Sequence, residues 1–294
     1  MSAAGTYRIG SYPVDRAGYG ALQLAGPGAF GPPRDRAEAL RVLREAIALG
    51  INHIDTADYY GPGVVNELIR DALHPYPADL AIVSKVGWAR DDAGGIHPSN
   101  DPAALHAAIE QNVRTLRIDR LAAVNLRLAN PSARPDARFD AQLEAMVAAR
   151  DAGLIAGVGL SNVDLAHLRR ALEVTEIVSV QNSLNWLDTS SVELLDETRR
   201  LDIAFAPFSP LGFPRSRHLE MVNDPVVAGH AQRYGITGEQ LLLAWLLALG
   251  PHVLLIAGTS SVEHLRENHA AADLRLDDET RAELDAIWRR RAVE

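Results

Sequence analysis

The chain has 294 residues, 47% hydrophobic and 23% charged, which is ample for the core of an α/β barrel built as one domain. With 29 basic and 38 acidic residues its net charge is −9, and without a basic run nucleic acid is not an expected partner. The chain lacks cysteine, a charged-then-apolar leader and any apolar stretch long enough to span a bilayer, so disulfides are excluded and a cytoplasmic protein without a membrane partner is expected.

Short apolar segments alternate with amphipathic ones along the chain. Residues 1–17 are predicted to form a short hairpin or arm, and residues 18–24 the first strand, where Gly20 lets the backbone approach a ligand closely. Further strands are predicted at 51–55, 80–84, 121–128, 154–160, 177–181, 203–207 and 253–256. Helices are predicted at 36–49, 64–73, 101–116, 140–152, 165–172, 191–200 and 240–249, with two more closing the chain.

About eight strand–helix units follow one another without a linker or repeat, which predicts a parallel sheet in one domain spanning residues 1–294. Residues 87–100 are predicted as a polar loop. Periodicity alone is compatible with a closed barrel and with an open doubly wound sheet. No GxGxxG motif follows an early strand, as an open dinucleotide-binding fold would usually show, and this favours the barrel.

Three polar residues lie where two neighbouring strands end. The segment GINHIDTADYYGPG begins with a predicted buried strand that ends at Asp55. The next predicted strand, LAIVS, is followed directly by Lys85. Tyr60, on the loop after Asp55, can come back over the strand end. A phenol has a reference pKa of about 10, so Lys85, paired with Asp55, is expected to lower the pKa of Tyr60. Taken one at a time, Asp55 could be a helix N-cap, Tyr60 a packed ring and Lys85 the solvated end of a strand.

The motif DTADYYG followed by NE, and then IVSKVG, resembles the aldo-keto reductases, and the match continues at matching spacing over nearly the whole chain. The resemblance implies a (β/α)8 TIM barrel with an N-terminal hairpin and extra C-terminal helices. It also implies that Asp55, Tyr60 and Lys85 belong to a catalytic tetrad whose fourth member is a histidine. Tyr60 would donate its proton to a carbonyl oxygen as hydride reaches the carbon.

The fourth tetrad position, in the segment LRIDRLAAVNLRLAN, holds Arg127 instead of histidine. Arg127 and Asn125 are two residues apart, so both side chains are expected to face the barrel interior, with Arg127 beside Tyr60. A buried guanidinium needs a partner, and the candidates are Asp55, Glu67 or an anion. Two interpretations stay open. Arg127 is either a structural replacement paired with a carboxylate, or a fixed donor to the substrate oxygen that favours anionic or strongly polar carbonyl compounds.

Polar and aromatic residues follow the fifth, sixth and seventh predicted strands, in the segments GLSN, QNSLN and APFSPLG. The resemblance implies that the cofactor is bound here, with amides on the nicotinamide carboxamide and an aromatic ring stacked on the nicotinamide. The residues concerned are Ser161, Asn162, Gln181, Phe208, Ser209 and Leu211, together with Gly20 and Asp55. Ordinary loop capping is the alternative for the serine and asparagine, and core packing is the alternative for Phe208.

The segment IAGTSSVEHLREN follows the last strand and resembles the family's site for the adenosine phosphate, at a helix start suited to an anion. The residues it contributes are Gly258, Thr259, Ser260, His264 and Asn268. Members that prefer NADP often have lysine at position 258 and arginine at position 264, and this chain has neither. NADP(H) is still the expected cofactor, and Arg215 or Arg217 could reach its phosphates instead.

Three aromatic residues just past strand ends could wall an apolar substrate pocket, namely Tyr59, Trp88 and Trp186, with Asn125 on the strand beside them. Buried packing is the alternative for each aromatic residue. No metal site is expected, because the histidines lack paired acidic or histidine spacing on one face.

Together these residues predict an NADPH-dependent oxidoreductase that reduces a small aldehyde or ketone to an alcohol. The alternative is a nicotinamide-binding redox sensor or accessory subunit with slow turnover, which would suit the missing tetrad histidine. A pyridoxal-type reductase and an enzyme that modifies sugars or natural products stay open as substrate classes, as do a monomer and a homo-oligomer.

Overall fold

The computed structural model describes residues 2–292, and in this part of the chain eight parallel strands form the central sheet. They are β3 (Ala17–Gly20), β4 (His53–Asp55), β5 (Ala81–Arg90), β7 (Ala123–Arg127), β8 (Val158–Ser161), β9 (Ser179–Ser183), β10 (Ala204–Phe208) and β11 (Leu255–Ile256). Their order is β10-β9-β8-β7-β5-β4-β3-β11. A parallel bridge between Phe205 and Val253 joins the two ends, so the sheet closes and the predicted (β/α)8 barrel is confirmed.

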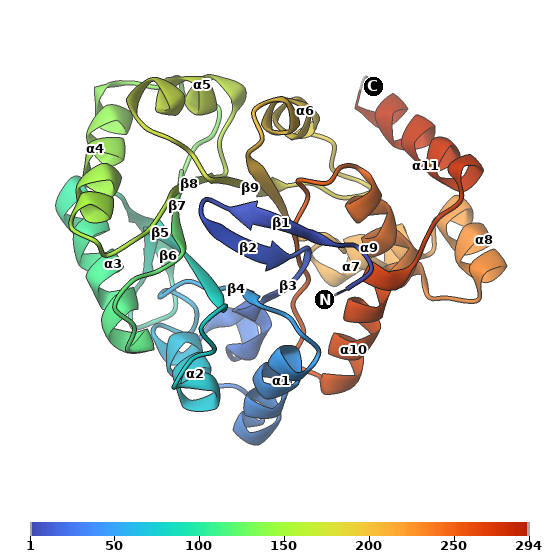
Figure 1. The fold of residues 1–294 in the computed structure, drawn as a ribbon, viewed down its shortest axis with the longest axis horizontal. Coiled ribbons are helices and arrows are strands. Elements are labelled where there is room, and N and C mark those ends of the chain that lie inside the picture. Colours follow the sequence, from blue (N-terminus) through green and yellow to red (C-terminus); the bar gives the residue numbers. More distant parts are fainter. Residues whose placement is uncertain (1, 293–294) are drawn as a thin grey trace.

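Helices surround the barrel (Figure 1). Those between or after strands are α1 (Arg36–Ala48), α2 (Val64–Leu73), α3 (Pro102–Leu116), α4 (Ala137–Asp151), α5 (Leu165–Val174), α6 (Val192–Arg200), α7 (Arg215–Val222), α8 (Pro225–Tyr234), α9 (Gly238–Ala248) and α10 (Val262–Ala270). The chain ends in α11 (Asp278–Arg291), and short 3-10 turns are η1 (Ala21–Leu24), η2 (Pro27–Ala29) and η3 (Ala271–Asp273). Six helices, α1, α3, α4, α5, α8 and α11, begin after an aspartate whose carboxylate accepts a first-turn N–H, which stabilises the helix start.

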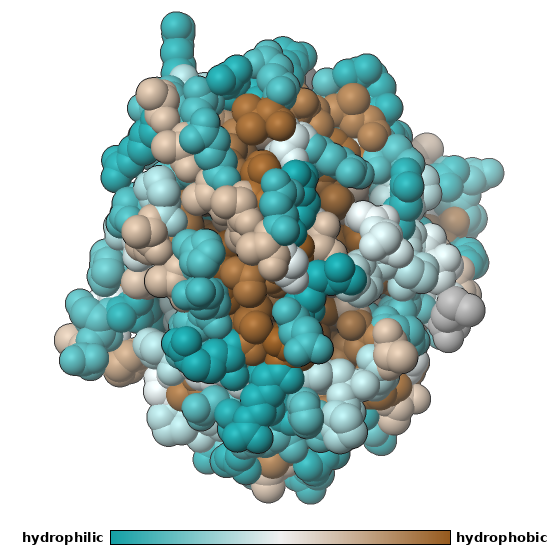
Figure 2. Space-filling model, turned by 60° about the vertical axis from the view of Figure 1, so that its left-hand side comes forward, coloured by the Kyte–Doolittle hydropathy of each residue, from teal (hydrophilic) through white to brown (hydrophobic). Residues whose placement is uncertain are grey.

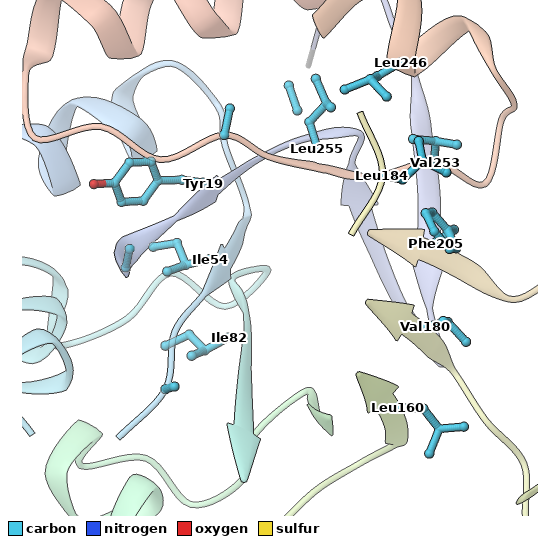
Figure 3. Close-up of a cluster of buried hydrophobic side chains, with 14 of the residues drawn as sticks. Tyr19, Ile54, Ile82, Leu160, Val180, Leu184, Phe205, Leu246, Val253 and Leu255 are labelled. Atoms are coloured by element: carbon cyan, nitrogen blue, oxygen red, sulfur yellow. The ribbon is translucent and has the colours of Figure 1, made fainter. Parts of the chain in front are cut away.

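The hydrophobic core lies between the strands and the helices. Tyr19, Ile54 and Ile82 stand side by side on three paired strands (Figure 3), and all are nearly or fully buried. Helix α9 packs on the same layer and is buried almost all round, as its apolar sequence predicts. Burying one large apolar side chain stabilises the fold by about 1.5–3 kcal/mol. The other set of alternating strand residues faces the barrel interior and is free to be polar.

An antiparallel hairpin closes the amino-terminal opening of the barrel. Its strands are β1 (Thr6–Ile9) and β2 (Tyr12–Asp15), and Figure 1 shows the hairpin crossing the centre of the ring. Ile9 and Val14 are buried in a second apolar cluster, whose other buried members include Ala81, Val83, Ala123, Val178, Ala204 and Leu254. The hairpin therefore fills this end with apolar side chains, and the predicted N-terminal hairpin is confirmed.

Arg16 joins the hairpin to the last part of the barrel. Its guanidinium is buried and donates to the carbonyl oxygens of Val253 at 3.1 Å and Ala4 at 3.1 Å, and to those of Leu247 and Gly250 at 2.5 Å each. Leu247 lies in the last turn of α9, where carbonyl groups lack helical partners and the helix dipole favours a cation.

Two sequence predictions about local structure are wrong. Residues 87–100 are not a loop, because β5 continues to Arg90 and pairs with β6 (Ile96–Ser99). The Asp91 carboxylate makes the tight turn by accepting the N–H groups of Ala93 and Gly95. The first strand ends at Gly20 and the 3-10 turn η1 follows, since Ala21 and Leu24 are three residues apart and bury the same side of a 3-10 turn.

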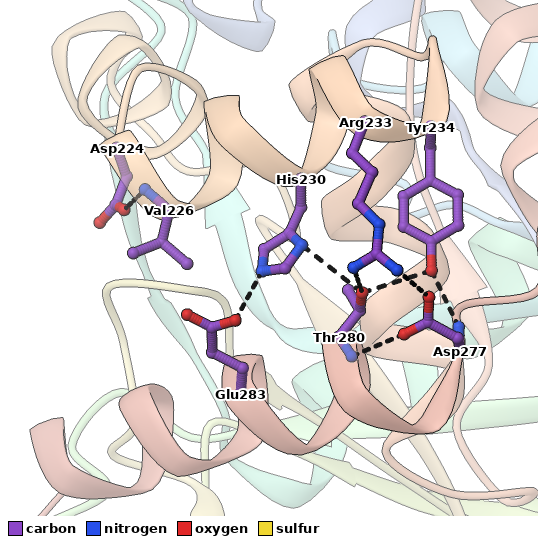
Figure 4. A network of polar contacts seen from close by, with 8 residues as sticks. All are labelled: Asp224, Val226, His230, Arg233, Tyr234, Asp277, Thr280 and Glu283. Carbon is purple, nitrogen blue, oxygen red and sulfur yellow. Dashed lines mark hydrogen bonds and ion pairs between the residues drawn. The ribbon is translucent and has the colours of Figure 1, made fainter.

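Helix α11 is held against α8 and α9 by polar contacts and by aromatic packing. Arg233 of α8 bonds Asp277 at 2.9 Å, and His230 of the same helix bonds Glu283 at 3.1 Å (Figure 4). Trp288 of α11 packs edge-on against Trp245 in the core. The expected extra C-terminal helices are confirmed. The single domain over residues 1–294 stays a prediction, and residues 1 and 293–294 lie outside the described residues.

Hydrophilic side chains cover most of the face shown in Figure 2, with hydrophobic side chains visible in narrow strips between them. Among the described residues, none of the helices has both the length and the apolar character needed to cross a bilayer. The cytoplasmic location stays a prediction.

Candidate active site

A buried ion pair joins Asp55, the last residue of β4, to Lys85 in the middle of β5, so this strand does not end at Lys85 as the sequence predicted. Lys85 Nζ donates to Asp55 Oδ1 at 2.5 Å and to the carbonyl oxygen of Thr56 at 3.0 Å. Gln181 Nε2 donates to the other carboxylate oxygen of Asp55 at 2.8 Å. The Lys85 and Asp55 side chains are only 3% and 4% exposed, so each charge depends on the other for compensation. The structure thus brings these two predicted residues into direct contact.

Tyr60 lies over this pair. Lys85 Nζ is 5.0 Å from the centroid of the Tyr60 ring, and the Tyr59 ring packs edge-on against it at 5.2 Å. Burial raises the pKa of Tyr60 well above its ordinary value, and Asp55 raises it further, while Arg127 and Arg90 lower it. The pKa of Tyr60 is therefore not lowered overall, because desolvation outweighs the neighbouring cations, and the contribution of Lys85 to it stays a prediction. Tyr60 carries its proton at neutral pH, as a proton donor must.

Arg127 is the last residue of β7, and its side chain contacts Ser161 and Phe208, two residues predicted to bind the cofactor. Its Nη1 donates to Ser161 Oγ at 3.0 Å, and its guanidinium carbon lies 4.8 Å from the centroid of the Phe208 ring. Both oxygens of Asp55 are bonded elsewhere, and no carboxylate lies within ion-pair distance of Arg127 in the described chain. The expectation that Asp55 or Glu67 pairs with Arg127 is therefore wrong.

The predicted pocket residues fall into different environments. Tyr59 is nearly buried beside Tyr60, and Trp88 is half-buried with an indole N–H that has no partner among the described residues. Asn125 is buried in the barrel, where its side-chain oxygen accepts from Ser179 Oγ at 2.8 Å. Pocket roles for these three residues stay predictions.

Trp186 does not line a pocket, and this expectation is wrong. The side chain is fully buried and packs edge-on against Trp245 at 5.4 Å. Its indole N–H donates to Asp224 at 3.0 Å, and the Arg291 guanidinium lies 4.7 Å from its ring. An aromatic residue after a strand end suits a pocket wall and a core equally well, and here the core contacts account for it.

Strands β8 and β9 and the turn after β8 offer polar atoms that fit a nicotinamide carboxamide. Gln181 Oε1 is buried without a hydrogen-bond partner among the described residues, although the same amide donates to Asp55. A buried acceptor of this kind is costly unless a donor reaches it. Asn162 adopts a positive φ of 55° and is held by the carbonyl oxygen of Leu128 at 2.8 Å. Ser161 lies beside both residues, so the expected amide-binding set is assembled at one place.

The loop after β10 places the next three predicted cofactor residues. Phe208 ends the strand with one ring face against Arg127. Ser209 has a positive φ of 52°, and its carbonyl oxygen accepts from Asn185 at 3.0 Å. A non-glycine residue with positive φ is uncommon and often marks a functional turn. Leu211 follows in the same loop, half-buried, and its role stays a prediction.

The predicted phosphate segment runs into α10, and a carboxylate that the sequence did not indicate lies there. Ser261 is the N-cap of α10, and Thr259 Oγ1 accepts the N–H of Ser261 at 3.1 Å. The N–H of Val262 donates to Glu38 Oε1 of α1 at 3.1 Å, and this bond lowers the pKa of Glu38. A negative charge thus occupies part of the anion site expected for the adenosine phosphate.

The other residues assigned to this end of the cofactor lie in the same segment or, for Gly20, close to it in space, and they make no contact that tests them. They are Gly20, Gly258, Ser260, His264 and Asn268. Position 258 must be glycine here, because a side chain would meet the carbonyl oxygen of Gly20 at 2.5 Å. Arg217 is exposed on α7 and pairs with Glu220.

Arg90 is a second residue that the sequence did not indicate. Its Nε donates to the carbonyl oxygen of Tyr59 at 3.1 Å, Nη1 to that of Gly94 at 2.8 Å and Nη2 to that of Gly28 at 3.0 Å. These carbonyl groups belong to three different loops at the carboxyl end of the barrel. Arg90 therefore holds the loops around Tyr60 together through hydrogen bonds, one of which is to the backbone of Tyr59.

The polar interior below Asp55 contains His53, which is 2% exposed. Burial lowers the pKa of His53 to about 4, so the imidazole is neutral at neutral pH. No group of three or more histidine, cysteine or acidic residues that could hold a metal occurs in the described range.

Similarities to known proteins bear on this arrangement. The model of the Aldo/keto reductase family matches residues 16–289. A protein of Escherichia coli (strain K12) named pyridoxine 4-dehydrogenase is 43% identical over 289 residues, which cover 98% of this chain and 99% of that protein. An uncharacterized oxidoreductase of Schizosaccharomyces pombe is 34% identical, with 97% and 90% covered. The crystal structure of an aldo/keto reductase from Klebsiella pneumoniae in complex with NADP and acetate superposes with a TM-score of 0.80 at 27% identity, covering 96% of this chain and 95% of that one.

Proposed function

Because the chain belongs to the aldo/keto reductase family and is therefore an oxidoreductase, we propose that it reduces an aldehyde or ketone to an alcohol with NADPH, with Tyr60 as the proton donor. The observation that carries this proposal is the position of Tyr60 over the buried Lys85–Asp55 pair. A protonated phenol beside a fixed cation is suited to give a proton to a carbonyl oxygen.

Tyr60, Lys85 and Asp55 have separate roles in the proton transfer. NADPH, when bound, supplies the hydride that adds to the carbonyl carbon. Tyr60 gives its proton to the carbonyl oxygen in the same step, so the products are the alcohol, NADP⁺ and a tyrosinate that takes a proton from water. Lys85 stabilises the negative charge that forms on Tyr60, and Asp55 holds Lys85 in place.

The nicotinamide end of the cofactor would be held by Ser161, Asn162 and Gln181. The unpaired buried Oε1 of Gln181 supports this assignment, because a carboxamide N–H would satisfy it. The Klebsiella relative that holds NADP supports the choice of cofactor. The adenosine phosphate would lie at the start of α10, where Glu38 must move aside or be tolerated.

The test is Tyr60→Phe, which removes the phenolic oxygen and keeps the ring. Carbonyl reduction should fall about 10²–10⁴-fold, while NADPH binding by fluorescence quenching should change little. Tyr76→Phe is a matched control, because its hydroxyl bonds the carbonyl oxygen of Leu116 at 2.6 Å, away from the site. Equal activity of Tyr60→Phe and Tyr76→Phe would overturn the role of Tyr60.

The name of the Escherichia coli relative makes pyridoxal, the aldehyde related to pyridoxine, the first substrate to test. Steady consumption of NADPH with pyridoxal or another aldehyde supports the enzyme. A single slow burst would favour a redox sensor, for which Arg127 at the usual histidine position is the motivating observation.

A further inference from the structure

Five polar side chains lie together between the barrel and the helices α2 and α3, behind the Lys85–Asp55 pair. Their members, which we call the polar network, are Thr56, Asn66, Ser84, Asn112 and Thr115. All but the last are fully buried. Side chains alternate along a strand, so Ser84 faces the helices while its neighbour Lys85 faces the barrel interior. The polar network therefore lies in a layer that apolar side chains fill elsewhere.

Hydrogen bonds join the members of the polar network. The Thr56 hydroxyl donates to Asn66 Oδ1 at 2.8 Å. Asn66 Nδ2 donates to Asn112 Oδ1 at 3.0 Å and to Thr115 Oγ1 at 3.1 Å. The Ser84 hydroxyl donates to the same Asn112 oxygen at 2.6 Å, and Asn112 Nδ2 donates to a carbonyl oxygen of its own helix at 2.8 Å. Each polar side-chain atom of the four buried members thus has a partner, and a fully satisfied buried network holds one arrangement rigidly.

The polar network reaches both partners of the ion pair. Thr56 follows Asp55 in the chain, and its backbone carbonyl oxygen accepts from Lys85 Nζ at 3.0 Å. Ser84 directly precedes Lys85 in β5. The network therefore fixes the chain neighbour of each partner. It also fixes one of the two oxygen atoms that the ammonium group bonds in the described chain.

We propose that the polar network positions the Lys85 ammonium group under Tyr60, with Thr56 as the main positioning residue. The inference rests on the proposed function, because there Lys85 stabilises the charge that forms on Tyr60. The Thr56 hydroxyl and carbonyl belong to one residue, so the bond to Asn66 helps to set the direction of the carbonyl toward Nζ. Apolar packing is not directional, whereas these hydrogen bonds are.

A displaced ammonium group should slow the chemical step and leave binding nearly unchanged. Lys85 Nζ lies 5.0 Å from the centroid of the Tyr60 ring, and the negative charge on Tyr60 forms only during the reaction. Interactions that are made only in the transition state contribute to the rate and not to ground-state affinity. A misplacement of about 1 Å can cost about 10²-fold in rate, so we expect a loss of about 10- to 100-fold.

The experiment begins with Thr56→Val, which removes the hydroxyl and keeps the shape of the side chain. Single-turnover reduction of pyridoxal and of 4-nitrobenzaldehyde by the NADPH-loaded protein should slow about 10- to 100-fold, with little change in the Kd of NADPH. Thr56→Ser keeps the hydroxyl and should restore most of the rate. Thr198→Val is the matched control, because Thr198 is also fully buried and its hydroxyl donates to the Leu194 carbonyl oxygen at 2.7 Å, within α6.

A spectroscopic measurement tests the position of Lys85 without turnover. Lys85 is the only lysine in the sequence, so protein labelled with ¹³C at the lysine ε-carbon gives a single side-chain signal by NMR. This signal should shift in Thr56→Val and return toward its wild-type position in Thr56→Ser, while Thr198→Val should leave it in place. Urea unfolding of the same variants shows how much stability each substitution removes.

The outcomes separate the inference from the proposed function. With an active wild type, a rate or a signal that Thr56→Val leaves unchanged overturns the inference. Equal rate losses in Thr56→Val and Thr198→Val, or no recovery in Thr56→Ser, overturn it as well, because the network is then merely structural.

An inactive wild type gives a different result. If neither aldehyde is reduced but the lysine signal moves as expected, the positioning of Lys85 stands and the proposed function fails. An inactive wild type whose signal does not move in Thr56→Val overturns both. Should Thr56→Val not fold, Ser84→Ala, which removes the other bond to Asn112 Oδ1, decides by the same measurements.

Discussion

Arg90→Ala removes three hydrogen bonds from the loops around Tyr60. Hydrogen bonds from a charged donor contribute about 1.5–3 kcal/mol each when buried, and less where they are exposed. Two of the three contacts are partly buried and the one to Gly28 is exposed, so we expect a local loss of about 2–4 kcal/mol. This loss should open the loops about 30- to 1000-fold more often, while the barrel itself keeps most of its stability.

Hydrogen exchange followed by mass spectrometry measures this opening directly. Peptides covering residues 26–33, 57–63 and 91–95 should exchange faster together in Arg90→Ala, and kcat/KM should fall because Tyr60 is no longer held in place. Arg90→Lys tests whether the planar guanidinium is needed, since lysine keeps a cation near Tyr60 but cannot bond three carbonyl groups at once. Arg170→Ala, which breaks exposed ion pairs on α5, is the control. Unchanged exchange in the three peptides of Arg90→Ala, or wild-type exchange in Arg90→Lys, would refute the reasoning.

Three further predictions follow from buried or misplaced charges. Lys85→Met leaves Asp55 buried without its cation and should lower the free energy of unfolding in urea by about 3–5 kcal/mol; a loss below about 1 kcal/mol would contradict the pairing. Burial raises the pKa of Asp58 to about 6, so the folded state holds this proton more tightly than the unfolded chain and stability falls as pH rises through that value. Asp58→Asn should therefore raise Tm above pH of about 6 and change it little below pH of about 4, and the reverse order would exclude this cause. Glu38→Gln should tighten NADPH binding on the order of tenfold and leave NADH nearly unchanged, as measured by fluorescence titration, because the carboxylate repels a phosphate at the start of α10; equal effects on both cofactors would argue against it.

The parts of the site that the sequence predicts are those encoded locally. Asp55 and Lys85 each come directly after a short apolar run in the sequence, and neighbouring parallel strands, here β4 and β5, bring such residues to the same side of a barrel. Ser161, the last residue of β8, and Gln181, in the middle of β9, were found in the same way. The barrel itself followed from the alternation of strands and helices together with the family resemblance.

The parts that the sequence could not predict depend on contacts between distant residues. Glu38 meets Val262 across 224 positions, and nothing in the sequence around Glu38 distinguishes it from a surface residue of a helix. Arg90 was hidden in a segment predicted as a loop, and its bond to Gly28 spans 62 positions. The pKa of Tyr60 depends on how much water the folded chain excludes, which neighbouring residues alone do not determine.

The joint between the first and last strands has a consequence for how the protein is made. The bonds from Arg16 to Leu247, Gly250 and Val253 span 231 to 237 positions, and β11 contributes only two paired residues to β3. During translation the ring therefore cannot close until this late segment has left the ribosome. Arg16 can make these bonds only at that point, so the joint between the first and last strands is the last part of the ring to form.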